Sequence, residues 1–301
     1  MTGLSLLQQA RAVVVLHGDP VLPPWLDALA RLTTLTLVVN DPGPGRYTAL
    51  PPAARVLINE RPRGFAANVN AVLGEVGEVL PAFLLCANFD LSLEVCALER
   101  LLDALDAHPR AGIAGPLLSN FKGEPVFSAG TRPTATKEFL RAAGLRGPHA
   151  LQLQRAVLRR TSGWKDRNAA GLGTRTLTAQ EYLPWTAVAL RTTAWKAVGP
   201  LDERFELYAE DLDWGVRLAA SDGEALLVDA GPVIHTERAT RGPRTSAVYE
   251  VSHRRLHQKH GWVGVSRWHA RGLVVRRRSI LRWLTERLDW AVIDERRGLH
   301  G

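Results

Sequence analysis

Short apolar segments alternate with segments of helical periodicity along the first 118 residues of the chain. The apolar segments are rich in branched residues and stop at polar or turn-forming residues, as buried strands do. They lie at 11–17, 34–39, 54–60 and 81–90. The segments between them that are predicted to be helices lie at 23–32, 64–76 and 92–109. This alternation predicts an α/β fold with a mostly parallel sheet flanked by helices, and with ligands bound beyond the carboxyl ends of the strands.

The regular alternation stops after residue 118. The sequence there predicts a hairpin region over 117–134, a basic helical segment over 137–160, and a strand followed by a helix over 185–199. A later pair of strands is expected to end at His235. We expect the α/β domain to extend over residues 1–248 and a basic, Trp-rich helical extension to occupy residues 249–301.

Composition limits the class of protein. The 301 residues are 46% hydrophobic and 23% charged, which is typical of a soluble globular protein. The net charge of +8 suits an anionic partner: nucleic acid, a phosphorylated small molecule or an acidic membrane surface. The two cysteines, Cys86 and Cys96, form no disulfide framework, and no leader or apolar run of ~18 residues is present. We therefore expect a cytoplasmic protein without a spanning helix.

Polar side chains follow each predicted strand. His17 follows the first strand, Asn40 and Asp41 follow the second, and Asn88 and Asp90 close the fourth. In an open α/β sheet these positions lie along one edge, where ligands bind. Structural alternatives exist for several of them, since Asp90 also suits a helix N-cap and His17 also suits a purely structural position.

The segment at residues 205–223 carries Glu206, Glu210, Asp211 and Asp213 among apolar and aromatic neighbours. Acidic residues are common in the first turn of a helix, where they interact well with the helix dipole. Crowded carboxylates also raise one another's pKa, which makes one of them a better general base near neutral pH. Both explanations suit this segment.

The chain beyond about residue 250 combines Arg and Lys with Trp and a helical Leu stripe. A solvated helix that packs its apolar side on the domain explains this pattern, and a surface for an anionic membrane or acceptor explains it equally well. Nucleic acid is not expected as a partner, because no nucleic-acid motif accompanies these residues.

The order of motifs from about residue 10 to 240 resembles the inverting family 2 glycosyltransferases, in particular their rhamnosyltransferase-like branch. The segments that carry the resemblance are "NERPRGFAANVNAVL", the strand ending "NFD", "VGPLDERFELYAEDLDWGVRL" and "VIHTE". The resemblance implies a GT-A (Rossmann-like) fold, a nucleotide-diphosphate-sugar donor, a divalent metal such as Mg²⁺ or Mn²⁺, and inversion at the anomeric carbon.

The resemblance also implies roles for single residues. Asp211 matches the family's catalytic base, and Glu210 is its catalytic neighbour. Asp90 matches the last residue of the metal-binding Asp-x-Asp, and His235 matches the late His that completes the metal site. Donor-nucleotide contacts are implied for His17, Asn40, Asp41, Arg63, Asn68 and Asn88, and an acceptor or sugar pocket is implied for Trp185 and Asp213.

Three positions depart from the family pattern. Asn40-Asp41 reverses the usual Asp-Asn, Asn88 replaces the first Asp of the metal motif, and Trp185-Thr186 replaces a small Gly-Ala pair. The sequence thus predicts a metal-dependent inverting glycosyltransferase of cell-wall or polysaccharide synthesis, acting from a dTDP-rhamnose or UDP-sugar donor on a saccharide or lipid-linked acceptor at the membrane surface. A sugar nucleotidyltransferase and a non-catalytic binding protein that acts through its basic tail are the alternatives.

Overall fold

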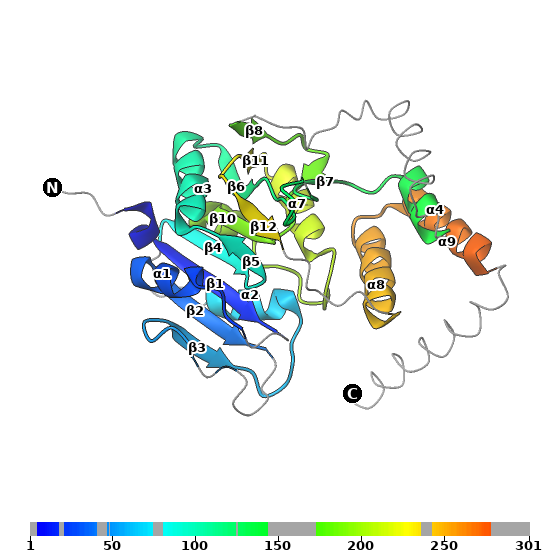
Figure 1. Ribbon diagram of the computed structural model, residues 1–301. Helices are drawn as coiled ribbons and strands as arrows, with labels where there is room; N and C mark the ends of the chain where they lie inside the picture. Colours follow the sequence, from blue (N-terminus) through cyan, green and yellow to red (C-terminus); the bar gives the residue numbers. More distant parts are fainter. Residues whose placement is uncertain are drawn as a thin grey trace. The chain divides into compact units, whose positions relative to one another are not determined.

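The computed structural model of the chain describes residues 5–17, 21–40, 47, 49–74, 81–124, 126–143, 173–235 and 243–277 (Figure 1). Its residues group into two compact units. The first comprises residues 1–132 and 168–239, and the second comprises residues 133–167 and 240–301. This grouping differs from a single division at residue 248, because a segment from the middle of the chain belongs with the C-terminal helices. The boundary between folding domains stays a prediction.

An eight-stranded sheet in the order β3-β2-β1-β4-β10-β6-β11-β8 forms the centre of the first unit. Its strands are β1 (Ala10–Leu16), β2 (Thr34–Val39), β3 (Arg55–Ile58), β4 (Phe83–Asn88), β6 (Ala111–Pro116), β8 (Thr174–Thr176), β10 (Ala187–Arg191) and β11 (Glu224–Val228). Strands β3, β2, β1 and β4 are parallel neighbours, and so are β6 and β11. The predicted α/β fold with a mostly parallel sheet is confirmed.

Helices cover both faces of this sheet (Figure 1). The helices of the first unit are η1 (Leu6–Gln9), α1 (Trp25–Leu32), α2 (Phe65–Leu73), α3 (Val95–Ala107), α6 (Thr192–Val198) and α7 (Glu210–Ala220). Alternation along β1 separates two hydrophobic clusters: Val14 packs with α1 and α3, whereas Val13 packs with α2, α6 and α7. Because both faces are covered, the strands are apolar on both sides, as their sequences indicate.

Strand β10 enters the middle of the sheet antiparallel to both β4 and β6. The sequence identifies this strand but not its place, since an apolar run carries no information about its neighbours. Two small sheets also form outside the main one. They pair β5 (Leu91–Leu93) with β12 (Val233–His235), and β7 (Gly130–Thr131) with β9 (Glu181–Tyr182). The pairing of β7 with β9 shows that the predicted hairpin region also pairs with a distant segment.

The second unit contains α4 (Ala135–Ala142), α8 (Pro243–Lys259) and α9 (Val263–Arg277). The basic helical segment predicted over 137–160 corresponds to α4 as far as residue 143, and its remainder lies outside the described residues. Across the described part of the chain, no helix has the length and apolar character that a bilayer-spanning segment needs. Cys86 and Cys96 are free thiols, as the sequence predicts.

Gly64 lies where the start of α2 meets the segment that leads into α7. A Cβ atom on Gly64 would lie 2.7 Å from the backbone oxygen of Glu206, closer than real Cβ contacts allow. That oxygen accepts a hydrogen bond from the Phe65 N–H at 3.0 Å. The absence of a side chain at Gly64 therefore permits the two backbones to meet.

We expect Gly64→Ala to lower the stability of the protein by about 1–3 kcal/mol, because the backbone at Glu206 must move to admit the methyl group. Gly264→Ala is the matched control, since a Cβ at Gly264 meets no atom within 4 Å. Thermal unfolding of both variants measures the difference. An unchanged melting temperature for Gly64→Ala would contradict the close approach described here.

Candidate functional site

Parallel pairing brings the ends of three strands to one edge of the sheet. Leu16 of β1 pairs with Val39 of β2, and Val15 of β1 pairs with Asn88 of β4. The residues that follow, His17 and Asn40, therefore lie at the same edge as Asn88, as expected from the sequence. His17 is exposed, whereas Asn40 is buried. Asp41 lies outside the described residues.

The small sheet of β5 and β12 brings Asp90 and His235 together. Leu91 in β5 pairs with His235 in β12, so Asp90, one residue earlier, lies beside the imidazole. The distance from His235 Nε2 to Asp90 Oδ2 is 3.4 Å. Both side chains are partly buried. Asp90 and His235 are 145 positions apart in the sequence. The fold nevertheless places a carboxylate oxygen and an imidazole nitrogen next to each other.

Asn40 holds the loop before α2 rather than presenting a free carboxamide. Its Oδ1 accepts hydrogen bonds from the Arg63 N–H at 2.8 Å and from Asn59 Nδ2 at 2.8 Å, and its Nδ2 donates to the Arg63 carbonyl at 3.0 Å. Asn68, which is fully buried, accepts from the same Asn59 Nδ2 at 2.7 Å and donates to the Arg63 carbonyl at 3.2 Å. The side chain of Arg63 is exposed. These contacts fix the loop backbone and leave the Arg63 side chain available to a ligand.

Helix α2 also holds the segment that leads into the acidic helix α7. Asn70 Nδ2 donates to the Leu201 carbonyl at 2.8 Å, and its Oδ1 accepts from the Leu201 N–H at 3.0 Å. Further along, Tyr208 and Ala209 adopt left-handed φ values of 67° and 70°. Such values are strained for residues with a side chain. This turn brings Glu210 and Asp211 into the first turn of α7.

Glu210 and Asp211 have raised pKa values. Burial raises the pKa of Asp211 to about 6, although backbone hydrogen bonds from Leu212 and Trp185 oppose the change. Burial and the negative charge of Asp211 raise the pKa of Glu210 well above its usual range. Glu210 Oε2 is buried and has no hydrogen-bond partner among the described residues. The first turn of α7 therefore holds two carboxyl groups with raised pKa values, and that of Asp211 lies close to neutral pH.

Asp213 faces a different environment on the same helix. It is fully buried and pairs with Arg217, with 3.0 Å between Nε and Oδ2. Arg217 in turn donates to the backbone carbonyl of Val198, the last residue of α6, at 2.6 Å and to that of Pro200, just after the helix, at 2.8 Å. The structure thus supports a role for Asp213 in holding α7 to α6. Its expected place in an acceptor pocket stays a prediction.

A cavity of about 540 Å³ lies beside α7 and is lined by Asp211 and Trp185. Tyr182 and Trp214 add further aromatic surface. Trp185 is itself 4% exposed, and its ring meets that of Trp214 edge to face at 5.4 Å between centroids. The size and the mixture of aromatic and carboxylate lining are typical of a small-molecule pocket. The structure therefore brings Trp185 and Asp211 to the same cavity, and the expected place of Trp185 in a sugar pocket stays a prediction.

Sequence reasoning missed Asn59 and Arg217, which shape the site, and it did not foresee the contacts of Asn70. Asn59 directly follows β3, so the strand-end argument applied to the other strands would have found it. Asn70 and Arg217 bond to backbone groups 131 and 19 residues away. No local pattern in the sequence marks such contacts.

Two curated proteins are similar to this chain. Both are named N-acetylglucosaminyl-diphospho-decaprenol L-rhamnosyltransferase, from Mycobacterium tuberculosis strains CDC 1551 / Oshkosh and ATCC 25618 / H37Rv. Each is 25% identical over 252 residues, which covers 76% of this chain and 76% of the relative. No protein-family model matches the chain.

A solved structure of GalNAc-T7 with UDP, GalNAc and Mn²⁺ has the same core fold, with a TM-score of 0.52 and 13% identity. This chain is therefore similar in sequence to the two rhamnosyltransferases and in core fold to GalNAc-T7. The match covers 83% of this chain and 47% of GalNAc-T7, so this chain spans about half the length of that protein. The fold and the resemblance predicted from the sequence are both confirmed.

We expect Asp211→Asn to stabilise the protein at pH 8 but not at pH 4. The raised pKa means that the folded chain keeps a proton that the unfolded chain loses as the pH rises above 3.8, so stability falls until the pH passes about 6. A neutral Asn avoids this loss, and the rise from 3.8 to about 6 corresponds to at most about 3 kcal/mol.

Thermal unfolding of Asp211→Asn and of the wild type between pH 4 and pH 8 measures this difference. Asp103→Asn on the exposed side of α3 is the control, because that carboxylate lies in solvent. A melting-temperature difference for Asp211→Asn that stays flat across this range would show that Asp211 is not held in a desolvated environment.

Proposed function

We propose that this chain is an inverting glycosyltransferase. In this proposal it transfers a sugar from a nucleotide-diphosphate donor to a hydroxyl group of a saccharide or lipid-linked acceptor, and Asp211 acts as the general base. The observation that carries the proposal is the environment of Asp211. The pKa of its carboxyl group is about 6, and it lines a pocket together with Trp185 and Tyr182.

The chemistry follows from this position. Asp211 takes the proton of the acceptor hydroxyl while the acceptor oxygen forms a bond to the anomeric carbon. The bond from that carbon to the donor diphosphate breaks on the opposite side, and the diphosphate leaves with the electron pair. Glu210 has a raised pKa, which disfavours a second negative charge beside the base. Its unpartnered Oε2 is available to accept a hydrogen bond from a bound sugar.

Asp90 and His235 fit a divalent cation such as Mg²⁺ or Mn²⁺. Their ligand atoms lie 3.4 Å apart, a separation suited to neighbouring positions around one ion. Asn88 is the last residue of β4, two positions before Asp90, and its side chain adds an amide oxygen to this short segment. Two or three protein ligands leave positions for the donor phosphates, as is usual for Mg²⁺. Such a cation, when bound, would neutralise charge on the departing diphosphate.

The donor and the acceptor are inferred from the relatives. Because the curated relatives are named as L-rhamnosyltransferases of N-acetylglucosaminyl-diphospho-decaprenol, we favour dTDP-rhamnose over a UDP-sugar, and a lipid-linked saccharide of cell-wall synthesis as the acceptor. The aromatic lining of the pocket by Trp185 and Tyr182 suits the apolar face of a sugar ring.

Contact with an anionic membrane surface is part of this proposal. Helix α9 exposes Val263, Trp268 and Val274, and Arg271 lies over the Trp268 ring at 4.9 Å. Exposed apolar and aromatic side chains beside arginine suit the interface of an anionic bilayer. The Leu stripe farther along the tail lies outside the described residues.

We expect dTDP or UDP species to raise the melting temperature of the wild type only when Mn²⁺ or Mg²⁺ is present. The reason is that a ligand which binds only the folded chain stabilises it by mass action. In Asp90→Ala the metal-dependent part of this shift should fall by more than half, because one of two ligands is lost. A thermal-shift screen of nucleotide diphosphates and nucleotide sugars, with and without metal, measures both effects.

Asp103→Ala is the control for this screen, because Asp103 is an exposed acidic residue on α3. It should keep the full metal-dependent shift. If no nucleotide stabilises the wild type, the donor site is assigned wrongly. If Asp90→Ala and Asp103→Ala behave alike, the metal lies elsewhere.

We also expect the kcat/KM of sugar transfer to rise with pH through an apparent pKa near 6, the value to which burial raises Asp211. Asp211→Asn should lower kcat by about 10²–10⁴-fold, the usual contribution of a general base. Donor binding in the thermal-shift screen should persist in this variant. Transfer that is independent of pH between 5 and 8, or full activity of Asp211→Asn, would remove Asp211 from the reaction.

A further inference from the structure

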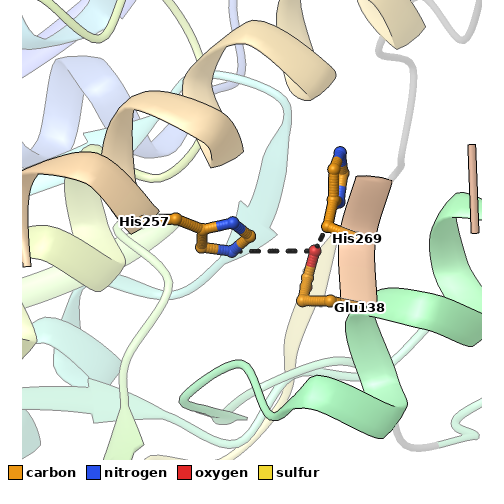
Figure 2. A group of neighbouring side chains, drawn as sticks. All are labelled: Glu138, His257 and His269. Atoms are coloured by element: carbon orange, nitrogen blue, oxygen red, sulfur yellow. Dashed lines mark hydrogen bonds and ion pairs between the residues drawn. The ribbon is translucent and has the colours of Figure 1, made fainter. Parts of the chain in front are cut away.

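The second unit holds a group of buried ionisable side chains that the proposed glycosyl transfer does not use. Glu138 on α4, His257 on α8 and His269 on α9 lie at its centre, and each is at most 3% exposed (Figure 2). Figure 2 shows both imidazole rings directed toward the Glu138 carboxylate. The three residues come from three different helices, so any ion held between them would connect the whole unit.

The close packing of α4 and α9 places this group. A Cβ on Gly272 would lie 2.4 Å from the Phe139 carbonyl oxygen and 2.8 Å from the Ala142 Cβ, so the two helices approach at backbone distance. The Phe139 and Trp268 rings meet edge to face at 5.6 Å between centroids. Glu138 directly precedes Phe139, and His269 directly follows Trp268. The contacts between the two helices therefore bring Glu138 and His269 together.

The distances within the group suit the first shell of a transition metal. Glu138 Oε2 lies 3.0 Å from His269 Nδ1 and 3.7 Å from His257 Nε2, and the ligand atoms of all three residues lie within 4.8 Å of one another. Around a tetrahedral ion with bonds of 2.0–2.1 Å, neighbouring ligand atoms are about 3.3 Å apart. The two distances from Glu138 Oε2, 3.0 Å to His269 Nδ1 and 3.7 Å to His257 Nε2, lie just below and just above that value.

Ion pairs explain part of the group without a metal. Arg141 donates to Glu138 Oε2 at 2.6 Å and to Glu250 Oε1 at 2.9 Å, and His269 bridges Glu138 and Glu250 with 3.0 Å contacts from its two nitrogens. This arrangement leaves His257 unexplained. Both of its ring nitrogens are buried and have no hydrogen-bond partner among the described residues, and burying polar atoms in this way is unfavourable.

We propose that Glu138, His257 and His269 bind one divalent transition metal of the zinc class, which connects α4, α8 and α9. Two imidazole ligands favour zinc over the oxygen-seeking Mg²⁺ and Ca²⁺. Arg141 is a positioning residue for the Glu138 carboxylate, as hydrogen-bonded outer groups are at other metal sites. Its Nη2 also lies 2.8 Å from His269 Nδ1, and this contact must give way when the metal binds. Water or His253, whose Nδ1 is also unpartnered, completes the shell.

This site is separate from the pair of Asp90 and His235, because those residues belong to the first unit. Burial lowers the pKa of His257 to about 4, so the ring is in the neutral form that binds metal at pH 7. His269 has the opposite tendency: burial opposes its proton, but hydrogen bonds to Glu138 and Glu250 outweigh burial and raise its pKa.

The test uses the full-length chain, stripped with EDTA and dialysed against Zn²⁺ in the absence of nucleotide. We expect about one zinc per chain by elemental analysis, and a melting temperature that is higher with zinc than without it. His257→Phe should lose the bound zinc and the zinc-dependent shift. Without zinc its melting temperature should equal or exceed that of the wild type, because the variant no longer buries unpartnered nitrogens.

His108→Gln is the matched control, since it removes a histidine of the first unit that bonds to the Ala104 carbonyl at 2.8 Å. It should keep the full stoichiometry. His257→Gln, with folding checked by circular dichroism, replaces His257→Phe if the latter does not fold. A wild type that binds no zinc overturns the proposal and leaves a cluster of ion pairs. Zinc that remains bound in the His257 variant also overturns it, because the ion then lies elsewhere.

Discussion

The register of the central sheet determines where the chemistry of this chain can occur. Because β1, β2 and β4 are parallel and end together, His17, Asn40 and Asn88 reach one edge although they are far apart in the sequence. The antiparallel strand β10 then pairs with β4, and the Asn88 N–H donates to the Thr186 carbonyl at 2.8 Å. This pairing places Trp185 at the same edge. A shift of one residue in any of these pairs would turn the polar residues to another face.

Contacts before the start of α7 hold the carboxyl groups of Glu210 and Asp211 in place. Asn70 and Gly64 connect α2 to the segment before α7, and the left-handed residues Tyr208 and Ala209 complete the turn. Left-handed backbone at a residue with a Cβ atom costs roughly 1–2 kcal/mol. Ala209 is the N-cap residue of α7 and makes no side-chain hydrogen bond that would offset this cost. The surrounding contacts must therefore stabilise the turn. Strain together with buried like charges is typical of functional sites rather than of structural helix starts.

Much of this arrangement could be predicted from the sequence, and the reason lies in periodicity. The strand ends and the helix starts are local patterns, so the α/β fold followed from them, whereas the roles of Asp90, Asp211 and His235 rest on the resemblance and stay predictions. The internal bonds of Asn40 could not be predicted, because a strand-end amide looks the same whether it meets a nucleotide or the Arg63 backbone. The burial of Asp213 with Arg217 depends on the packing of α7 on α6, which no short motif encodes.

The two units bury acidic side chains with opposite electrostatic results. Glu210 and Asp211 have no cation among their causes of pKa change, so burial dominates and their pKa values rise. Glu138 is buried as deeply, but hydrogen bonds from His269 and Arg141 outweigh burial and lower its pKa. A carboxylate that is desolvated and lacks a cation gains stability by taking a proton, whereas one that is paired does not. The raised pKa of Asp211 in the first unit suits proton transfer, whereas the lowered pKa of Glu138 in the second unit keeps that carboxylate charged.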